Sequence, residues 1–196
     1  MQLEIFKSDV ELETRNSKLE TDELARRARR IKLLLMDCDG VLTDARLWLT
    51  PDGDELKAFH ARDGQGISVW HHAGWQSGII SGRASSSLKR RAHELNMTYV
   101  HQYAKEKTVA FEEIIADAKV SAEECCYIGD DLGDVAVMQR VGFAVAVADA
   151  ADDTKAAAHY VTKVNGGKGA VREAIELILK SQDRWDELVA QVTAPG

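Results

Sequence analysis

Five aspartates occur in two short segments that lie far apart in the chain. Asp37 and Asp39 belong to the segment DCDGVLTD, and Asp130, Asp131 and Asp134 belong to GDDLGD. Carboxylates crowded together repel one another unless a cation neutralises them, and Mg²⁺ prefers hard oxygen ligands of this kind. If the two segments meet in the fold, the sequence predicts a magnesium site.

A hydroxyl and a lysine add a second possibility to these carboxylates. Ser81 begins the segment Ser-Gly-Arg, and Lys107 follows further along the chain. Together with backbone N–H groups they would form a cradle for a phosphoryl group. One of the first two aspartates would then attack phosphorus, and the other would protonate the leaving oxygen and later deprotonate water. The residue types therefore indicate phosphoryl transfer through a phosphorylated aspartate.

The segments between these motifs predict the fold that positions them. Residues 31–36 (IKLLLM) read as a buried parallel strand. Strand-like runs at 76–80, 98–100, 125–128, 143–147 and 160–161 alternate with helix-like stretches at about 66–73, 84–95, 106–118, 132–141 and 169–182. This alternation predicts an α/β fold with a doubly wound parallel sheet. Ligands of such sheets bind beyond the carboxyl ends of the strands, where the motifs stand.

The predicted domain of residues 31–182 includes a hairpin, and one segment flanks the domain on each side. Apolar runs on either side of Pro-Asp-Gly-Asp predict a protruding β-hairpin at about 46–59. Residues 1–30 are a polar extension that we expect to be helical. Residues 183–196 are expected to form a loose C-terminal tail.

Composition narrows the range of functions. The chain has 196 residues, 29% of them charged, and a net charge of −7, which disfavours nucleic-acid binding because that usually requires a basic face. No apolar run is long enough to span a membrane, and no secretory leader is evident. The three cysteines do not form a disulfide pattern, so we expect a reducing, cytoplasmic location.

The order of the motifs carries a resemblance to a known family. DxDGVLTD, SGR, an isolated lysine and GDDxxD follow one another as in the haloacid dehalogenase superfamily of phosphatases. The stretches ELKAF (55–59), RDGQGI (62–67), AVAVADA (144–150), YVT (160–162) and GGKGAVRE (166–173) resemble the 3-deoxy-D-manno-octulosonate 8-phosphate (KDO 8-phosphate) phosphatase family over about residues 31–180. Members of this family remove phosphate from a sugar acid destined for lipopolysaccharide.

The resemblance implies a role for each motif. Asp37 would be the nucleophile and a ligand of Mg²⁺. Asp39 would be the general acid and base, and its backbone carbonyl would also bind the metal. Asp130 would be the third protein ligand. Ser81 and Lys107 would hold the transferred phosphoryl group.

Other implied roles concern the surroundings of the reaction. Asp131 or Asp134 would orient metal-bound water or the lysine. The family lacks a large cap domain and forms homotetramers, in which the hairpin and a neighbour's C-terminal segment help to close the site. Candidates for binding the sugar acid are Gly82, Arg83, Arg62, Lys168 and Arg172. Lys168 stands where the family commonly has arginine, and a lysine cannot make a planar bidentate pair with a carboxylate.

Three alternatives remain beside this reading. The same chemistry would serve a nine-carbon nonulosonate 9-phosphate. A phospho-aspartate receiver also combines acids, Mg²⁺, a hydroxyl and a lysine, but its phosphorylated aspartate follows the third strand, where this chain has His101 and Gln102. A catalytically silent assembly module would be expected to have lost at least one of the catalytic residues, and all of them are present.

Overall fold

The computed structural model describes residues 21–51 and 55–194, in which a parallel sheet forms the centre of the fold. The sheet has six strands in the order β5-β4-β1-β6-β7-β8. Every neighbouring pair is parallel. The strands are β1 (Leu33–Met36), β4 (Gln76–Ile80), β5 (Tyr99–His101), β6 (Cys125–Gly129), β7 (Phe143–Ala146) and β8 (Tyr160–Val161).

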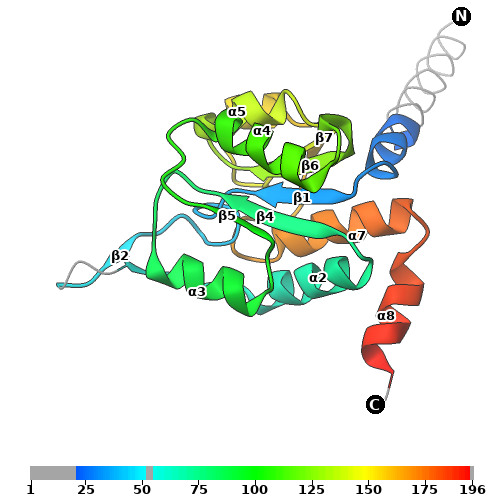
Figure 1. The fold of residues 1–196 in the computed structure, drawn as a ribbon, viewed down its shortest axis with the longest axis horizontal. Coiled ribbons are helices and arrows are strands. Elements are labelled where there is room, and N and C mark those ends of the chain that lie inside the picture. Colours follow the sequence, from blue (N-terminus) through cyan, green and yellow to red (C-terminus); the bar gives the residue numbers. More distant parts are fainter. Residues whose placement is uncertain (1–20, 52–54, 195–196) are drawn as a thin grey trace, which may run out of the picture.

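Helices cover both faces of this sheet. They are α2 (Ala61–His72), α3 (Ser86–Glu94), α4 (Lys107–Ala118), α5 (Leu132–Met138), α6 (Asp152–Ala156), α7 (Ala170–Ser181) and α8 (Trp185–Thr193). Figure 1 shows α4 and α5 on one side of the strands and α2, α3 and α7 on the other. The predicted doubly wound α/β architecture is confirmed. Strands β1 and β6 are buried along their whole length, as expected for central parallel strands covered on both faces.

The strand order creates a switch point beside β1. From β1 the chain runs to β4 on one side, and later returns to β6 on the other side of β1. Loops that leave neighbouring strands in opposite directions open a crevice at the carboxyl edge of the sheet. The segments that follow β1, β4 and β6 therefore converge at one place.

The hairpin is present where the sequence predicts it. Strands β2 (Trp48–Leu49) and β3 (Glu55–Leu56) pair in an antiparallel manner outside the main sheet. Its tip, residues 52–54, lies outside the described residues. Trp48, Leu49 and Leu56 are all more than half exposed. The hairpin thus extends from the domain with an apolar surface that no other described residue covers.

The expectation of a loose C-terminal tail is wrong for residues 185–193, because they form α8. Trp185 and Leu188, one helical turn apart, are both buried. The guanidinium of Arg172 lies over the Trp185 ring, 4.7 Å from its centroid. This packing against α7 makes the helix part of the domain.

The start of α2 also differs from the prediction. The helix begins at residue 61 instead of about 66, although Gly64 and Gly66 lower its intrinsic helix propensity. Both glycines face close neighbours: a Cβ on Gly64 would lie 2.3 Å from Arg91, and one on Gly66 would lie 2.9 Å from Arg172. Tertiary packing therefore outweighs local propensity here.

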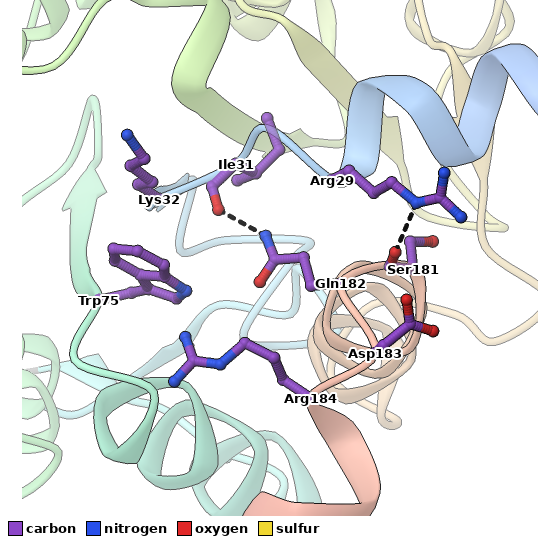
Figure 2. Close-up of a pocket in the computed structure, with 8 residues that line it drawn as sticks. All are labelled: Arg29, Ile31, Lys32, Trp75, Ser181, Gln182, Asp183 and Arg184. Atoms are coloured by element: carbon purple, nitrogen blue, oxygen red, sulfur yellow. Dashed lines mark hydrogen bonds between the residues drawn. The ribbon is translucent and has the colours of Figure 1, made fainter.

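The segment before β1 meets the end of α7 at the amino edge of the sheet. Gln182 Nε2 donates a hydrogen bond of 2.7 Å to the Ile31 carbonyl, and Arg29 Nε donates one of 2.9 Å to the Ser181 carbonyl (Figure 2). These residues line a pocket of about 280 Å³ that lies at the end of β1 opposite to Asp37. Residues 21–28 are helical as expected, and the other predicted helical residues, 1–20, lie outside the described residues. Within the described part of the chain, no helix is both long and apolar enough to cross a bilayer.

A close backbone contact supports the segment after β1. The loop that contains Gly166 packs against this segment, and Gly167 N donates to the Val41 carbonyl at 2.9 Å. A Cβ on Gly166 would lie only 1.6 Å from the Gly40 carbonyl oxygen. Only glycine allows the two backbones to approach this closely.

We expect Gly166→Ala to lower the free energy of unfolding by about 1–3 kcal/mol, because the backbone must shift to admit the methyl group. The matched control is Gly133→Ala, where a Cβ would meet no atom within 4 Å. Urea unfolding of both variants checks this. An equal loss in the two variants, or no loss in Gly166→Ala, would contradict the close contact.

Candidate active site

The segment after β1 is a tight turn that presents two carboxylates. Asp37 N donates to the Ile128 carbonyl at 3.0 Å, so this residue continues the sheet ladder. Cys38 then points into the core, where it is fully buried, and its carbonyl accepts from Leu42 N at 2.9 Å. Gly40 has a φ of +97°, and a Cβ there would lie 1.9 Å from Asp130 Oδ2. The glycine therefore lets the two acidic loops touch.

The second acidic loop is fixed by hydrogen bonds at the start of α5. Asp131 is the N-cap, and its carboxylate accepts from Leu132 N at 2.8 Å. The buried Asp134 reaches back, and its Oδ2 accepts from Asp130 N at 3.0 Å and from Asp131 N at 3.3 Å. This reciprocal capping holds the loop in one conformation.

Lys107 connects this loop to Asp37. Lys107 is the first residue of α4, and its Nζ lies 2.7 Å from Asp134 Oδ1 and 3.1 Å from Asp37 Oδ1. The buried hydroxyl of Tyr127 also donates to Asp134 Oδ1, at 2.7 Å. Asp134 thus contacts the lysine, as would be required for one of the two roles expected of Asp131 or Asp134. Tyr127 was not predicted, since nothing marks it among the apolar residues of its strand.

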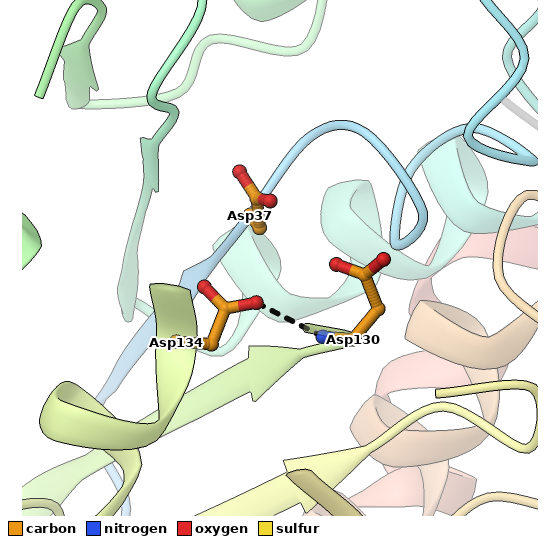
Figure 3. A group of neighbouring side chains, drawn as sticks. All are labelled: Asp37, Asp130 and Asp134. Atoms are coloured by element: carbon orange, nitrogen blue, oxygen red, sulfur yellow. Dashed lines mark hydrogen bonds between the residues drawn. The ribbon is translucent and has the colours of Figure 1, made fainter. Parts of the chain in front are cut away.

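Three carboxylates in this group are close enough to share a cation. One oxygen each from Asp37, Asp130 and Asp134 lies within 4.8 Å of the others (Figure 3). Both oxygens of Asp134 are already occupied by hydrogen-bond donors. Asp130 Oδ1, in contrast, is buried and has no hydrogen-bond partner among the described residues. Asp37 and Asp130 therefore offer the hard oxygen ligands that fit Mg²⁺.

The electrostatics of the group agree with this fit. Burial raises the pKa of Asp37, and the charge of Asp134 raises it further. Burial also raises the pKa of Asp130, and the neighbouring charges of Asp134 and Asp37 contribute, bringing it to about 8. Once deprotonated, these carboxyl groups carry a charge that the protein side chains neutralise only in part, so a divalent cation would be attracted to them.

The expected phosphate-binding residues line the same pocket, which has a volume of about 320 Å³. Ser81 follows β4 and is buried, and its Oγ accepts from Arg83 N at 3.3 Å. The lining residues predicted from the sequence are Asp37, Asp39, Ser81, Gly82, Arg83, Lys107, Asp130, Asp131 and Asp134. The structure thus brings together residues from four strand ends, as predicted.

Two residues of the hairpin also reach this site. The Lys57 side chain is only 2% exposed; its ammonium contacts Asp39 Oδ1 and lies 3.2 Å from Glu55 Oε2. Although burial alone lowers the pKa of Lys57, these acidic contacts hold it above its usual value, so the side chain is charged. Neither residue was assigned to the site from the sequence. The alternation Glu55-Leu56-Lys57 on a strand, with both charges on one face, is the signal that would have indicated them.

The remaining predicted sugar-binding residues lie elsewhere in the chain's own fold. Arg62, Lys168 and Arg172 line a separate pocket of about 440 Å³. Arg172 Nε donates to Glu176 at 2.8 Å, within α7. Within one chain these residues therefore line a different pocket from Gly82 and Arg83, and their binding of the sugar acid stays a prediction. The physical reason is that they come from the starts of α2 and α7 and the loop before α7, and not from a strand end beside β1.

The sheet, its acidic edge and the lysine form the arrangement of a haloacid dehalogenase-like hydrolase, and a profile of that family matches residues 96–175. A KDO 8-phosphate phosphatase of Yersinia pestis is 44% identical over 84% of this chain and 88% of its own length. One of Escherichia coli K12 is 38% identical over 94% and 98%. The chain belongs to this superfamily and, within it, to the family of 3-deoxy-D-manno-octulosonate 8-phosphate phosphatases.

A solved structure agrees with this placement. The KDO 8-phosphate phosphatase of Moraxella catarrhalis, in complex with a magnesium ion, a phosphate ion and a KDO molecule, is 37% identical. It superposes with a TM-score of 0.85 over 88% of this chain and 99% of that chain. The recognition of the family and the fold class from the sequence are both confirmed.

We expect Mg²⁺ to stabilise the protein more at pH 8 than at pH 5.5. The raised pKa values of Asp37 and Asp130 mean that the folded state holds more protons than the unfolded state between about pH 4 and pH 8. Without metal, these groups therefore make the protein less stable as the pH rises through that window. Mg²⁺ binds the deprotonated carboxylates and offsets this loss.

Thermal unfolding with and without Mg²⁺ at the two pH values measures the effect. In the control variant Asp130→Asn, both the stabilisation by Mg²⁺ and its dependence on pH should shrink. An equal shift of the melting temperature at both pH values would refute the assignment of these carboxylates to the metal.

Proposed function

We propose that the protein is a Mg²⁺-dependent phosphatase that hydrolyses KDO 8-phosphate to KDO and phosphate, a step in the formation of lipopolysaccharide precursors. The supporting observation is the contact between Asp37, at the end of β1, and Lys107, beside the unpartnered carboxylate oxygen of Asp130. The family relationship supports the phosphatase activity. The ligands of the Moraxella catarrhalis structure support the substrate and the metal.

In the first step, a carboxylate oxygen of Asp37 attacks phosphorus. The bond between phosphorus and the C8 oxygen breaks, and Asp39 gives its proton to that oxygen, so the sugar acid leaves as an alcohol. Lys107 and the Ser81 hydroxyl hold the phosphoryl oxygens. The product on the enzyme is an aspartyl-phosphate at Asp37.

In the second step, water hydrolyses the aspartyl-phosphate. Asp39, now a carboxylate, removes a proton from water, whose oxygen attacks phosphorus. The bond to Asp37 breaks, inorganic phosphate forms, and both aspartates return to their starting states.

Asp37, Asp130 and the backbone carbonyl of Asp39 would hold Mg²⁺. When bound, Mg²⁺ neutralises negative charge on the phosphoryl group during transfer. Asp134 orients Lys107 through the contact of 2.7 Å, and Asp131 keeps the loop in place through its cap at Leu132.

Phosphate release from a panel of phosphate esters tests the proposal. The panel contains KDO 8-phosphate, nonulosonate 9-phosphates, hexose 6-phosphates and an aryl phosphate. We expect KDO 8-phosphate to be preferred, with activity lost in Asp37→Asn and on addition of EDTA, because nucleophile and metal are both required.

Other outcomes of the panel would change the proposal in defined ways. Turnover restricted to the nine-carbon acids would keep the mechanism and replace the substrate. No turnover by the metal-loaded protein would reject the proposed function and favour the assembly module or the phospho-aspartate receiver.

We also propose that the chain forms a homotetramer through its hairpin. Trp48 and Leu49 are 59% and 68% exposed, and together with Leu56 they form an apolar surface beside the site. Light scattering should give a mass of four chains for the wild type and a smaller mass for Leu49→Ser. A monomeric wild type would reject this part of the proposal.

A further inference from the structure

A partly buried ion-pair cluster lies between the hairpin and the loop after β1. It contains two carboxylates, Asp39 and Glu55, and two cations, Lys57 and Arg83. The Lys57 side chain is 2% exposed and Arg83 is 48% exposed. A buried ammonium is seldom found without a structural or chemical role, because removing it from water is costly.

The two oxygens of Asp39 have different surroundings. Oδ1 accepts from the Lys57 ammonium. Oδ2 is buried and has no hydrogen-bond partner among the described residues; Arg83 Nε, the cation beside it, is 3.8 Å away. Lys57 thus holds Oδ1 of Asp39, and Oδ2 is left available to a ligand in the pocket.

Lys57 can fix Asp39 because its own position is fixed. It directly follows β3 and also contacts Glu55 Oε2 at 3.2 Å. The Glu55 carbonyl accepts from the Ser87 hydroxyl at 2.9 Å, which anchors the base of the hairpin on α3. The ammonium is therefore held by the body of the domain.

We propose that Lys57 is a positioning residue that holds Asp39 Oδ1, so that Oδ2 faces the oxygen of the leaving group. The inference rests on the proposed function, in which Asp39 protonates that oxygen. It goes further because it assigns the orientation of the Asp39 carboxyl group to Lys57, a residue of the hairpin. The position of the hairpin would therefore affect how readily the leaving group is protonated.

A positioning role and a merely structural role of Lys57 can be told apart by comparing kcat/KM for substrates with different leaving groups. The alkoxide of KDO 8-phosphate must receive a proton to leave, whereas the phenolate of 4-nitrophenyl phosphate leaves without one. The ratio kcat/KM includes the steps up to departure of the leaving group and excludes the later hydrolysis of the aspartyl-phosphate. It therefore includes the step in which Asp39 acts as an acid and excludes the step in which Asp39 acts as a base.

We expect Lys57→Met to lower kcat/KM for KDO 8-phosphate by about 100-fold, the lower end of the usual contribution of a general acid. For 4-nitrophenyl phosphate the loss should stay below about threefold. Lys57→Arg, which keeps the charge, should recover part of the selective loss. Asp39→Asn should show the same selectivity, and the double variant should lose little more than Asp39→Asn alone.

A matched control is an exposed lysine outside the cluster. Lys89 lies on α3, and its side chain takes no part in the ion pairs of the cluster. Lys89→Met should leave the ratio of the two kcat/KM values unchanged. Circular dichroism of each variant shows whether the fold is kept, and the ratio remains informative even where the amount of folded protein falls, because both substrates are assayed on one sample.

Several results would overturn the inference. An equal loss for both substrates in Lys57→Met would assign Lys57 to the structure of the hairpin. A higher KM for KDO 8-phosphate with unchanged kcat would assign it to substrate binding. A wild type that hydrolyses neither ester would reject the proposed function itself, which keeps the two failures distinguishable.

Discussion

Repulsion between carboxylates crowded at one edge of a sheet is the constraint on which this structure depends. Asp37 and Asp130 meet because Gly40 has no side chain to separate the loops. Burial and the nearby charge of Asp134 then raise the pKa values of both carboxyl groups. Lys107 is the cation that contacts this group among the described residues. The negative charge that remains makes this edge of the sheet suitable for binding a divalent cation together with a phosphate ester.

The residues that organise this edge serve folding and chemistry together. Asp131 and Asp134 cap α5 in a reciprocal manner, and Asp134 also accepts from Lys107 and Tyr127. A helix cap and a contact that orients Lys107 could be regarded as alternative roles for such aspartates. The structure shows that they are compatible, because the two oxygens of Asp134 face different partners.

The sequence predicted well what depends on local pattern and chain order. The six main strands and the meeting of Asp37, Ser81, Lys107 and Asp130 follow from apolar runs that end in functional residues, since the carboxyl ends of parallel strands share an edge. Predictions failed where long-range packing decides. Helix α8 forms because Trp185 and Leu188 find a buried surface on α7 and α2, and the early start of α2 depends on close contacts of its glycines.

The hairpin explains why part of the site could not be found from motifs. The groups proposed to bind the phosphoryl group come from strand ends, whose positions the buried sheet fixes. Glu55 and Lys57 belong instead to the hairpin outside that sheet, and Lys57 meets Asp39 only in the folded chain. In the proposed reaction, the side of the pocket nearest the leaving group is therefore built by an element that lies outside the core. With this arrangement, the same strand-end residues could transfer a phosphoryl group from different leaving groups, because a different element contacts each leaving group.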